Sequence, residues 1–152
     1  MNAHAIGSIA VAAVLLAGCC LAPRGEGGSA GDRVTAAICK EKECKVAVRV
    51  AACTITVDPE WLGVARGNRD VAIVWEIRNS PGVTFAKEGP IFFKERDREP
   101  AARQFSKPQP MGDTTYRWTM ANNSPGVFHY GIRVVDNGRA CPPLDPTIVA
   151  DM

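Results

Sequence analysis

The sequence predicts an all-β protein built as an antiparallel Greek-key β-sandwich, and three observations support this prediction. Apolar residues recur at every second position in several segments, which is the period of a half-buried strand. Short sequences rich in glycine and proline separate these segments, as turns between strands do. No segment of useful length has apolar residues at the helical period of about 3.6. A chain of 152 residues, 22% of them charged, supports one such domain and leaves little room for a second.

Four segments show this alternation, and in each the apolar row is expected to face the core. A last short strand is expected at Ile148 and Val149. The four rows are Cys44, Val46, Val48 and Val50; Val71, Ile73, Trp75 and Ile77; Tyr116, Trp118 and Met120; and Phe128, Tyr130, Ile132 and Val134.

Breaks in the alternation mark the places where the chain is expected to turn. After Ala51-Ala52 the apolar residues Ile55 and Val57 continue on the opposite parity, so a bulge or a corner between sheets is expected there. The sequences NSPG at 79–82 and NNSPG at 122–126 are typical turns.

The segments 94–103 and 104–113 together make the longest excursion between expected strands. Segment 94–103 (KERDREPAAR) mixes both charge signs, which is typical of a solvated loop. Such an excursion is a reasonable place for contact with a partner. Trp61, next to a proline turn, is expected to be the most exposed of the three tryptophans, with Trp75 and Trp118 in the core.

The N-terminal residues predict export. Residues 6–16 (IGSIAVAAVLL) are mostly apolar and too few to span a bilayer as an ordinary helix, which suits a secretion signal. The following Leu16-Ala17-Gly18-Cys19 resembles the lipobox of bacterial lipoproteins. The resemblance implies that Cys19 becomes the first mature residue and carries the lipid, with membrane attachment as the result. An ordinary signal peptide cut near Ala22, or a wrongly assigned start, remains the alternative.

The lipobox divides the chain into three expected parts: a signal peptide (1–18), a flexible tether (19–38) and a single β-sandwich domain (39–152). The tether is expected because residues 20–37 are rich in Gly, Ala, Ser and Pro and have almost no bulky apolar side chains. Because Cys20, and not aspartate, follows the lipidated cysteine, the lipobox resemblance implies the outer membrane. The basic residue usual near the start of such signals is missing.

Two stretches of the later sequence resemble cupredoxin-like domains. Residues 57–74 are similar to the early strands of that family, and residues 124–130 (SPGVFHY) to its aromatic penultimate strand. The resemblance implies a cupredoxin-like or immunoglobulin-like sandwich. In the family a cysteine copper ligand closes the aromatic strand, but Ile132 stands at that position here. His129 is the only histidine of the mature part and is expected to point to the face opposite to Phe128 and Tyr130, so the ligands of an electron-transfer copper centre are missing.

Export places the domain cysteines in an oxidising compartment, where disulfides are expected. Cys39, Cys44, Cys53 and Cys141 allow three pairings. We favour Cys53 with Cys141, which would pin a C-terminal loop to an early strand, and Cys39 with Cys44. The spacing of Cys39 and Cys44 lacks the pattern of a zinc ribbon.

These observations predict a non-catalytic, lipid-anchored protein of the bacterial cell envelope that binds a protein partner. The net charge of +2, from 18 basic and 16 acidic residues, argues against nucleic acid. No motif supports catalysis, and no cofactor is expected. One alternative is weak copper handling on a degenerate cupredoxin-like scaffold, by His129 with a free thiol or with Met111, Met120 or Met152. The other is inhibition of a periplasmic or host enzyme through residues 94–113.

Overall fold

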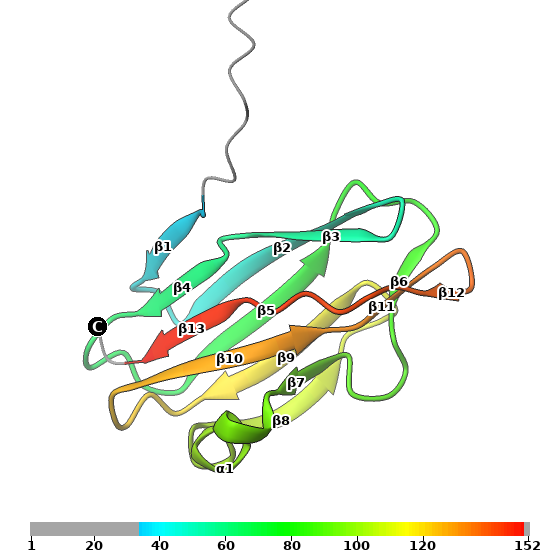
Figure 1. Cartoon of the computed structure of the whole chain (residues 1–152). Coiled ribbons are helices and arrows are strands. Elements are labelled where there is room, and N and C mark those ends of the chain that lie inside the picture. The colour runs from blue at the N-terminus through cyan, green and yellow to red at the C-terminus, as the bar shows by residue number, and fades with distance from the viewer. Residues whose placement is uncertain (1–33, 151–152) are drawn as a thin grey trace, which may run out of the picture. The chain divides into compact units, whose positions relative to one another are not determined.

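The structure is a computed structural model that describes residues 34–150 (Figure 1). These residues belong to one compact unit, Asp32–Met152. The expected signal peptide, the lipidation site at Cys19, Cys20, most of the expected tether, and Met152 lie outside the described residues. Within residues 34–150, no helix is long and apolar enough to cross a bilayer.

The described residues form an all-β sandwich with a single helix, α1 (Glu95–Gln104). One layer has the strand order β1-β4-β13-β10-β7 and is extended by a three-stranded sheet, β12-β11-β6. The other layer has the order β3-β2-β5-β9-β8. The strands are β1 (Ala36–Cys39), β2 (Glu43–Ala51), β3 (Thr54–Asp58), β4 (Trp61–Val64), β5 (Val71–Ile77), β6 (Val83–Phe85), β7 (Ile91–Phe93), β8 (Phe105–Pro110), β9 (Thr115–Met120), β10 (Gly126–Ile132), β11 (Val134–Asp136), β12 (Arg139–Ala140) and β13 (Thr147–Ala150).

The alternating rows meet between the two layers and form the core. On β2, β5 and β10 the predicted inward residues are buried, except Ile77 at the end of β5, which is partly buried. Trp75 of β5 meets Tyr130 of β10 edge to face, with ring centroids 5.5 Å apart, and its indole N–H donates a hydrogen bond to the Tyr130 hydroxyl (3.2 Å). Because these strands belong to different sheets, the pair joins the two layers through both packing and a hydrogen bond.

The sheets are mixed, and the prediction of purely antiparallel pairing is wrong at three places. β2 pairs with β5 in parallel, and β4 pairs in parallel with both β1 and β13. The physical reason is connectivity: β1 and β2 lie in different layers, as do β3 and β4, so neighbours within a layer are often not consecutive in the chain. The alternation within one strand does not show which strands are neighbours in a sheet or whether they pair in parallel.

The parity change after Ala51 is a tight hairpin and not a bulge. Ala52 and Cys53 connect β2 to β3, and Ala51 pairs directly with Thr54. Both connecting residues have positive φ, 48° and 63°, which a two-residue hairpin turn of the primed type requires. Neither residue is the glycine or asparagine that normally marks such a turn, so the turn has only a weak signal in the sequence.

Residues 95–104 form helix α1, so the expected solvated loop is wrong. Only Ala101 and Gln104 of the helix are buried, and Pro100 lies inside it, which explains why no apolar period was visible. Acidic residues in its first turn and Arg103 in its last turn suit the helix dipole. Glu99 and Arg103 form an ion pair one turn apart (2.9 Å).

The sandwich begins slightly earlier than the sequence suggested. Strand β1 starts at Ala36 and pairs with β4 from Trp61 onward, whereas residues up to 38 were expected to belong to the tether. Ala36 and Ala37 have short side chains, so this segment shows no apolar alternation that would predict a strand. Their backbone nevertheless pairs with β4 and forms the edge strand of the sheet.

Candidate functional site

His129 lies on the outward face of β10 and binds the start of α1. Its neighbours Phe128 and Tyr130 are buried, so the imidazole points away from the core, as predicted. The His129 carbonyl accepts a hydrogen bond from the Lys94 N–H (3.1 Å). The His129 N–H donates to Oδ2 of Asp97 (2.9 Å). The first turn of α1 is therefore fixed to the sheet by two backbone groups of one residue.

The imidazole adds a further contact to the same carboxylate. His129 Nδ1 lies 2.9 Å from Oδ2 of Asp97, whose side chain is only 14% exposed. Burial alone would raise the pKa of Asp97, but the backbone and side-chain hydrogen bonds from His129 outweigh burial and hold that pKa below its ordinary value. Asp97 is thus an ionised group in a fixed position.

An open recess of about 840 Å³ lies over this contact. Lys94 forms an ion pair with Asp145 on its wall (2.6 Å), and Arg96 Nε lies 3.7 Å from Oδ2 of Asp97. We call it the α1 recess; its lining residues are Lys94, Glu95, Arg96, His129 and Asp145.

The α1 recess can make ionic contacts and hydrogen bonds with a partner. None of its lining residues carries the hydroxyl or thiol that a histidine base would activate. Cationic and anionic side chains alternate on its wall, which favours a partner surface with both signs of charge.

The cysteine prediction is confirmed at the level of pairing. Cys39 and Cys44 are joined with an S–S distance of 1.93 Å, and Cys53 and Cys141 with one of 2.09 Å. Oδ or sulfur atoms of Cys53, Cys141 and Asp136 lie within 4.8 Å of one another. Because the two sulfurs are bonded to each other, neither is a free thiolate available to a metal.

The residues proposed for weak copper handling are not brought together. Met120 is fully buried in the core. Met111 lies in the turn between β8 and β9, in the layer opposite to His129. His129 itself is engaged by Asp97. Within residues 34–150, His129, Met111 and Met120 therefore do not converge on one copper site.

A second surface lies on the same sheet as His129 and is apolar. Ile38 pairs with Gly63, Gly63 with Val149, and Val149 with Val127 across β1, β4, β13 and β10. Directly paired residues point to the same side of a sheet, so these residues share its outward face. Trp61 precedes Gly63 by two positions and therefore shares that face too. We call it the Trp61 face, comprising Ile38, Trp61, Gly63, Val127 and Val149.

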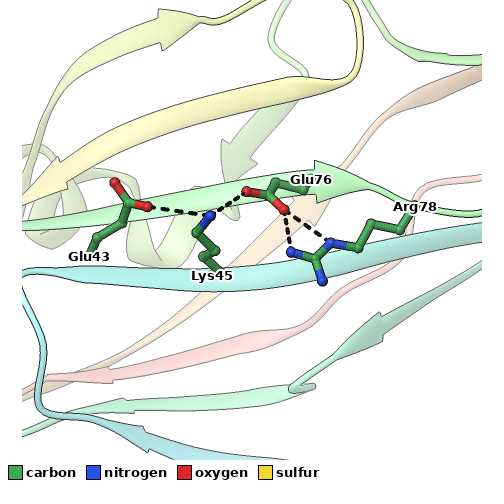
Figure 2. Close-up of polar contacts among 4 residues, drawn as sticks. All are labelled: Glu43, Lys45, Glu76 and Arg78. Atoms are coloured by element: carbon green, nitrogen blue, oxygen red, sulfur yellow. Dashed lines mark hydrogen bonds and ion pairs between the residues drawn. The ribbon is translucent and has the colours of Figure 1, made fainter.

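The outward face of the other layer is ionic. On β2 and β5, Lys45 Nζ lies 3.0 Å from one oxygen of Glu76 and 3.7 Å from Glu43, and Arg78 contacts the other oxygen of Glu76 (Figure 2). Hydrogen bonds from Arg78 and then Lys45 lower the pKa of Glu76, and the bond to Glu76 raises that of Lys45. The two layers therefore differ in the surface they present.

The sequence named the 94–113 excursion as a place for partner contact but did not predict the α1 recess or either outward face. Lys94, Glu95 and Arg96 of the recess come from that excursion, whereas His129 and Asp145 lie outside it. The exposure of Trp61 was predicted and is confirmed. The Asp97–His129 contact joins residues 32 positions apart and has no local signal. A weak signal for α1 was present in the spacing of Glu99 and Arg103.

No protein-family model matches this chain, and no curated protein matches it.

Proposed function

We propose that this chain is a non-catalytic, lipid-anchored protein of the bacterial cell envelope that binds a protein partner through the α1 recess. The observation that carries the proposal is the fixed start of α1, which His129 holds by three contacts to Lys94 and Asp97. A helix held in this way presents Arg96 and its neighbours in one orientation, which lowers the ordering cost of binding.

The anchoring part of the proposal depends on Leu16-Ala17-Gly18-Cys19. A thioether-linked lipid on Cys19 would attach the sandwich to a membrane, with the outer membrane as the proposed location. The fold would be a Greek-key sandwich of the cupredoxin-like kind. Its support is the two packed mixed sheets together with the likeness of residues 57–74 and 124–130 to that family.

Anchoring is tested by comparing the wild-type protein with Cys19→Ser after membrane fractionation and mass spectrometry of the mature N-terminus. We expect the wild-type protein in the membrane fraction with a lipid mass on Cys19, and Cys19→Ser in the soluble fraction. An unmodified mature protein that begins after Ala22 would contradict the proposal.

Partner binding is tested with a photo-crosslinking amino acid placed at Arg96, whose side chain is 68% exposed. The matched control carries the same amino acid at Glu43, on the ionic face of the other layer. We expect one discrete adduct from position 96 and none from position 43. Adducts of equal intensity at both positions would contradict a specific surface. The identity of the adduct also decides whether the partner is an enzyme that the chain inhibits.

A further inference from the structure

Exposed apolar side chains of the described region are concentrated on the Trp61 face. Ile38 is 57% exposed, Val127 50% and Trp61 47%. They come from three strands of one sheet, β1, β10 and β4. Scattered exposed apolar residues are ordinary on protein surfaces, but a group on one face of one sheet indicates a contact surface.

The Trp61 face also contains a hollow without charged walls. Gly63 stands at its centre, between Ile38 of β1 and Val149 of β13. A cavity of about 290 Å³ opens there, lined by Ala36, Ala37, Ile38, Trp61, Gly63 and Val149. The side chains of these residues are apolar apart from the indole N–H of Trp61, and Gly63 has none. The hollow accordingly suits hydrocarbon better than a polar ligand.

The short distance along the chain between the proposed lipid anchor and the Trp61 face favours a membrane as the partner of this face. Val34 leads into β1, the outermost strand of this sheet, and Val34 is 34 − 19 = 15 positions after Cys19. Fifteen residues span at most about 55 Å when fully extended. A lipid on Cys19 would therefore hold the start of β1, at the edge of the Trp61 face, within about 55 Å of a bilayer. The tether would then lower the entropic cost of bringing the face to the membrane.

We propose that the Trp61 face rests on the lipid bilayer, with the Trp61 ring at the headgroup boundary. This inference rests on the proposed lipid anchor. Tryptophan favours that boundary because its ring is apolar and its N–H is polar. The ionic face of the other layer, with Glu43, Lys45 and Glu76 (Figure 2), then points to water.

The charges beside the Trp61 face indicate that the contact is apolar and not electrostatic. In the α1 recess, Lys94 and Arg96 are opposed by Glu95 and Asp145. A balanced group of this kind gives no net attraction to anionic lipids. We therefore expect docking to depend little on salt or on the anionic lipid fraction.

The test uses the purified full-length protein in vesicles of phosphatidylethanolamine and phosphatidylglycerol, with and without brominated acyl chains that quench tryptophan on contact. Mass spectrometry of the same sample reports the lipid on Cys19. We expect brominated lipid to reduce the emission of the wild-type protein, and Trp61→Phe to lose this quenching. Trp75 is fully buried and Trp118 is partly buried. Both are therefore expected to contribute an emission that brominated lipid does not quench.

Two variants examine the face itself. Ile38→Asp and Val127→Asp change exposed side chains and are expected to fold, as circular dichroism would verify, but to lose the quenching. The matched control is Met111→Asp, which alters a side chain of similar exposure (51%) in the opposite layer and is expected to keep it.

Each other outcome overturns the inference in a distinguishable way. A lipidated wild-type protein without Trp61 quenching, or with quenching that Ile38→Asp leaves intact, overturns the membrane contact while the anchor stands. A quenching that disappears in high salt overturns the apolar mode. A change from dimer to monomer in Ile38→Asp, without wild-type quenching, identifies a second copy of the chain as the occupant. A mature protein without lipid on Cys19 overturns both the anchor and the docking.

Discussion

At the scale of single residues, Asp97 attaches α1 to strand β10 through its two contacts with His129. We expect Asp97→Asn to lower the free energy of unfolding by about 1–2 kcal/mol at neutral pH, because charge-assisted hydrogen bonds from His129 are weakened. The measurement is urea denaturation, with Glu95→Gln, an exposed neighbour on α1, as the control. Equal losses in both variants would contradict a specific role of Asp97.

The same carboxylate predicts a pH dependence. The folded-state pKa of Asp97 lies below its ordinary value, so its contribution is fully present above that ordinary value, near 4, and is lost as pH falls through the folded-state pKa. We expect a stability difference between wild type and Asp97→Asn at pH 5 that shrinks as the pH falls below about 4. Denaturation curves across this range measure it, and a difference that persists at the acid end would contradict the assignment.

Tyr130 is the buried polar residue most closely tied to the core. Its hydroxyl accepts from Trp75 Nε1 (3.2 Å), and burial raises the pKa of Tyr130 so far that it stays neutral. We expect Tyr130→Phe to lower the free energy of unfolding by about 1–3 kcal/mol, since the indole N–H loses its buried acceptor. A loss within measurement error, at unchanged denaturant dependence, would show that the indole N–H finds another acceptor.

Residue-scale prediction from sequence succeeded where the strand period decides orientation. Alternation alone predicts that Phe128 and Tyr130 point inward and that His129 points outward. The partner of His129 could not be found in this way, because Asp97 lies on a different element. A contact of that kind depends on the position of α1. The sequence did not predict this helix, because α1 has only two buried residues and therefore no apolar period.

At the scale of elements, the two disulfides differ in the length of chain that they close. Cys53 and Cys141 are 88 residues apart, whereas Cys39 and Cys44 are 5 apart. A longer closed loop removes more entropy from the unfolded chain. We expect the Cys53→Ser/Cys141→Ser double variant to lose about 4–5 kcal/mol, and Cys39→Ser/Cys44→Ser about 2 kcal/mol. Denaturant titration measures both, and the reverse order would contradict this account.

The ionic contact between β2 and β5 is a surface interaction with a modest effect. We expect Glu76→Gln to lower the free energy of unfolding by a few tenths to about 1 kcal/mol, and the loss to shrink in high salt because ions screen exposed pairs. The control is Glu88→Gln, an exposed glutamate without an ion pair among residues 34–150. A salt-independent loss would point to packing and not to charge.

Prediction of elements succeeded where packing demands alternation and failed where tertiary contacts override a weak local pattern. On β2 only one face is buried, whereas on β5 the opposite residues Ala72 and Val74 are buried as well. Helix α1 has just two buried residues, Ala101 and Gln104, and contains Pro100, so its helical period is almost invisible. Its stability comes from contacts to β10 and from its own charges, which a local pattern does not report.

At the scale of the whole molecule, the sandwich class could be predicted and the strand order could not. Alternation and turns locate the longer strands, such as β2, β5 and β10, but they do not define the number of strands. The three parallel pairs arise because the chain passes repeatedly between the layers. The favoured disulfide pairing is the observed one, although the sequence by itself did not choose among the three possible pairings. The two contrasting outward faces depend on strand order, and hence they emerged only with the fold.

The Cys39–Cys44 bond has a mechanical consequence for a domain held from its N-terminal side. A pull that enters at Ala36 travels along β1, an edge strand that could be peeled away from β4. At Cys39 the covalent bridge passes the tension directly to Cys44 at the start of β2, bypassing the turn between them. The load then falls on the parallel β2–β5 pair in the middle of the second layer. Reduction of this one bond would redirect the force through four exposed residues and the sheet edge.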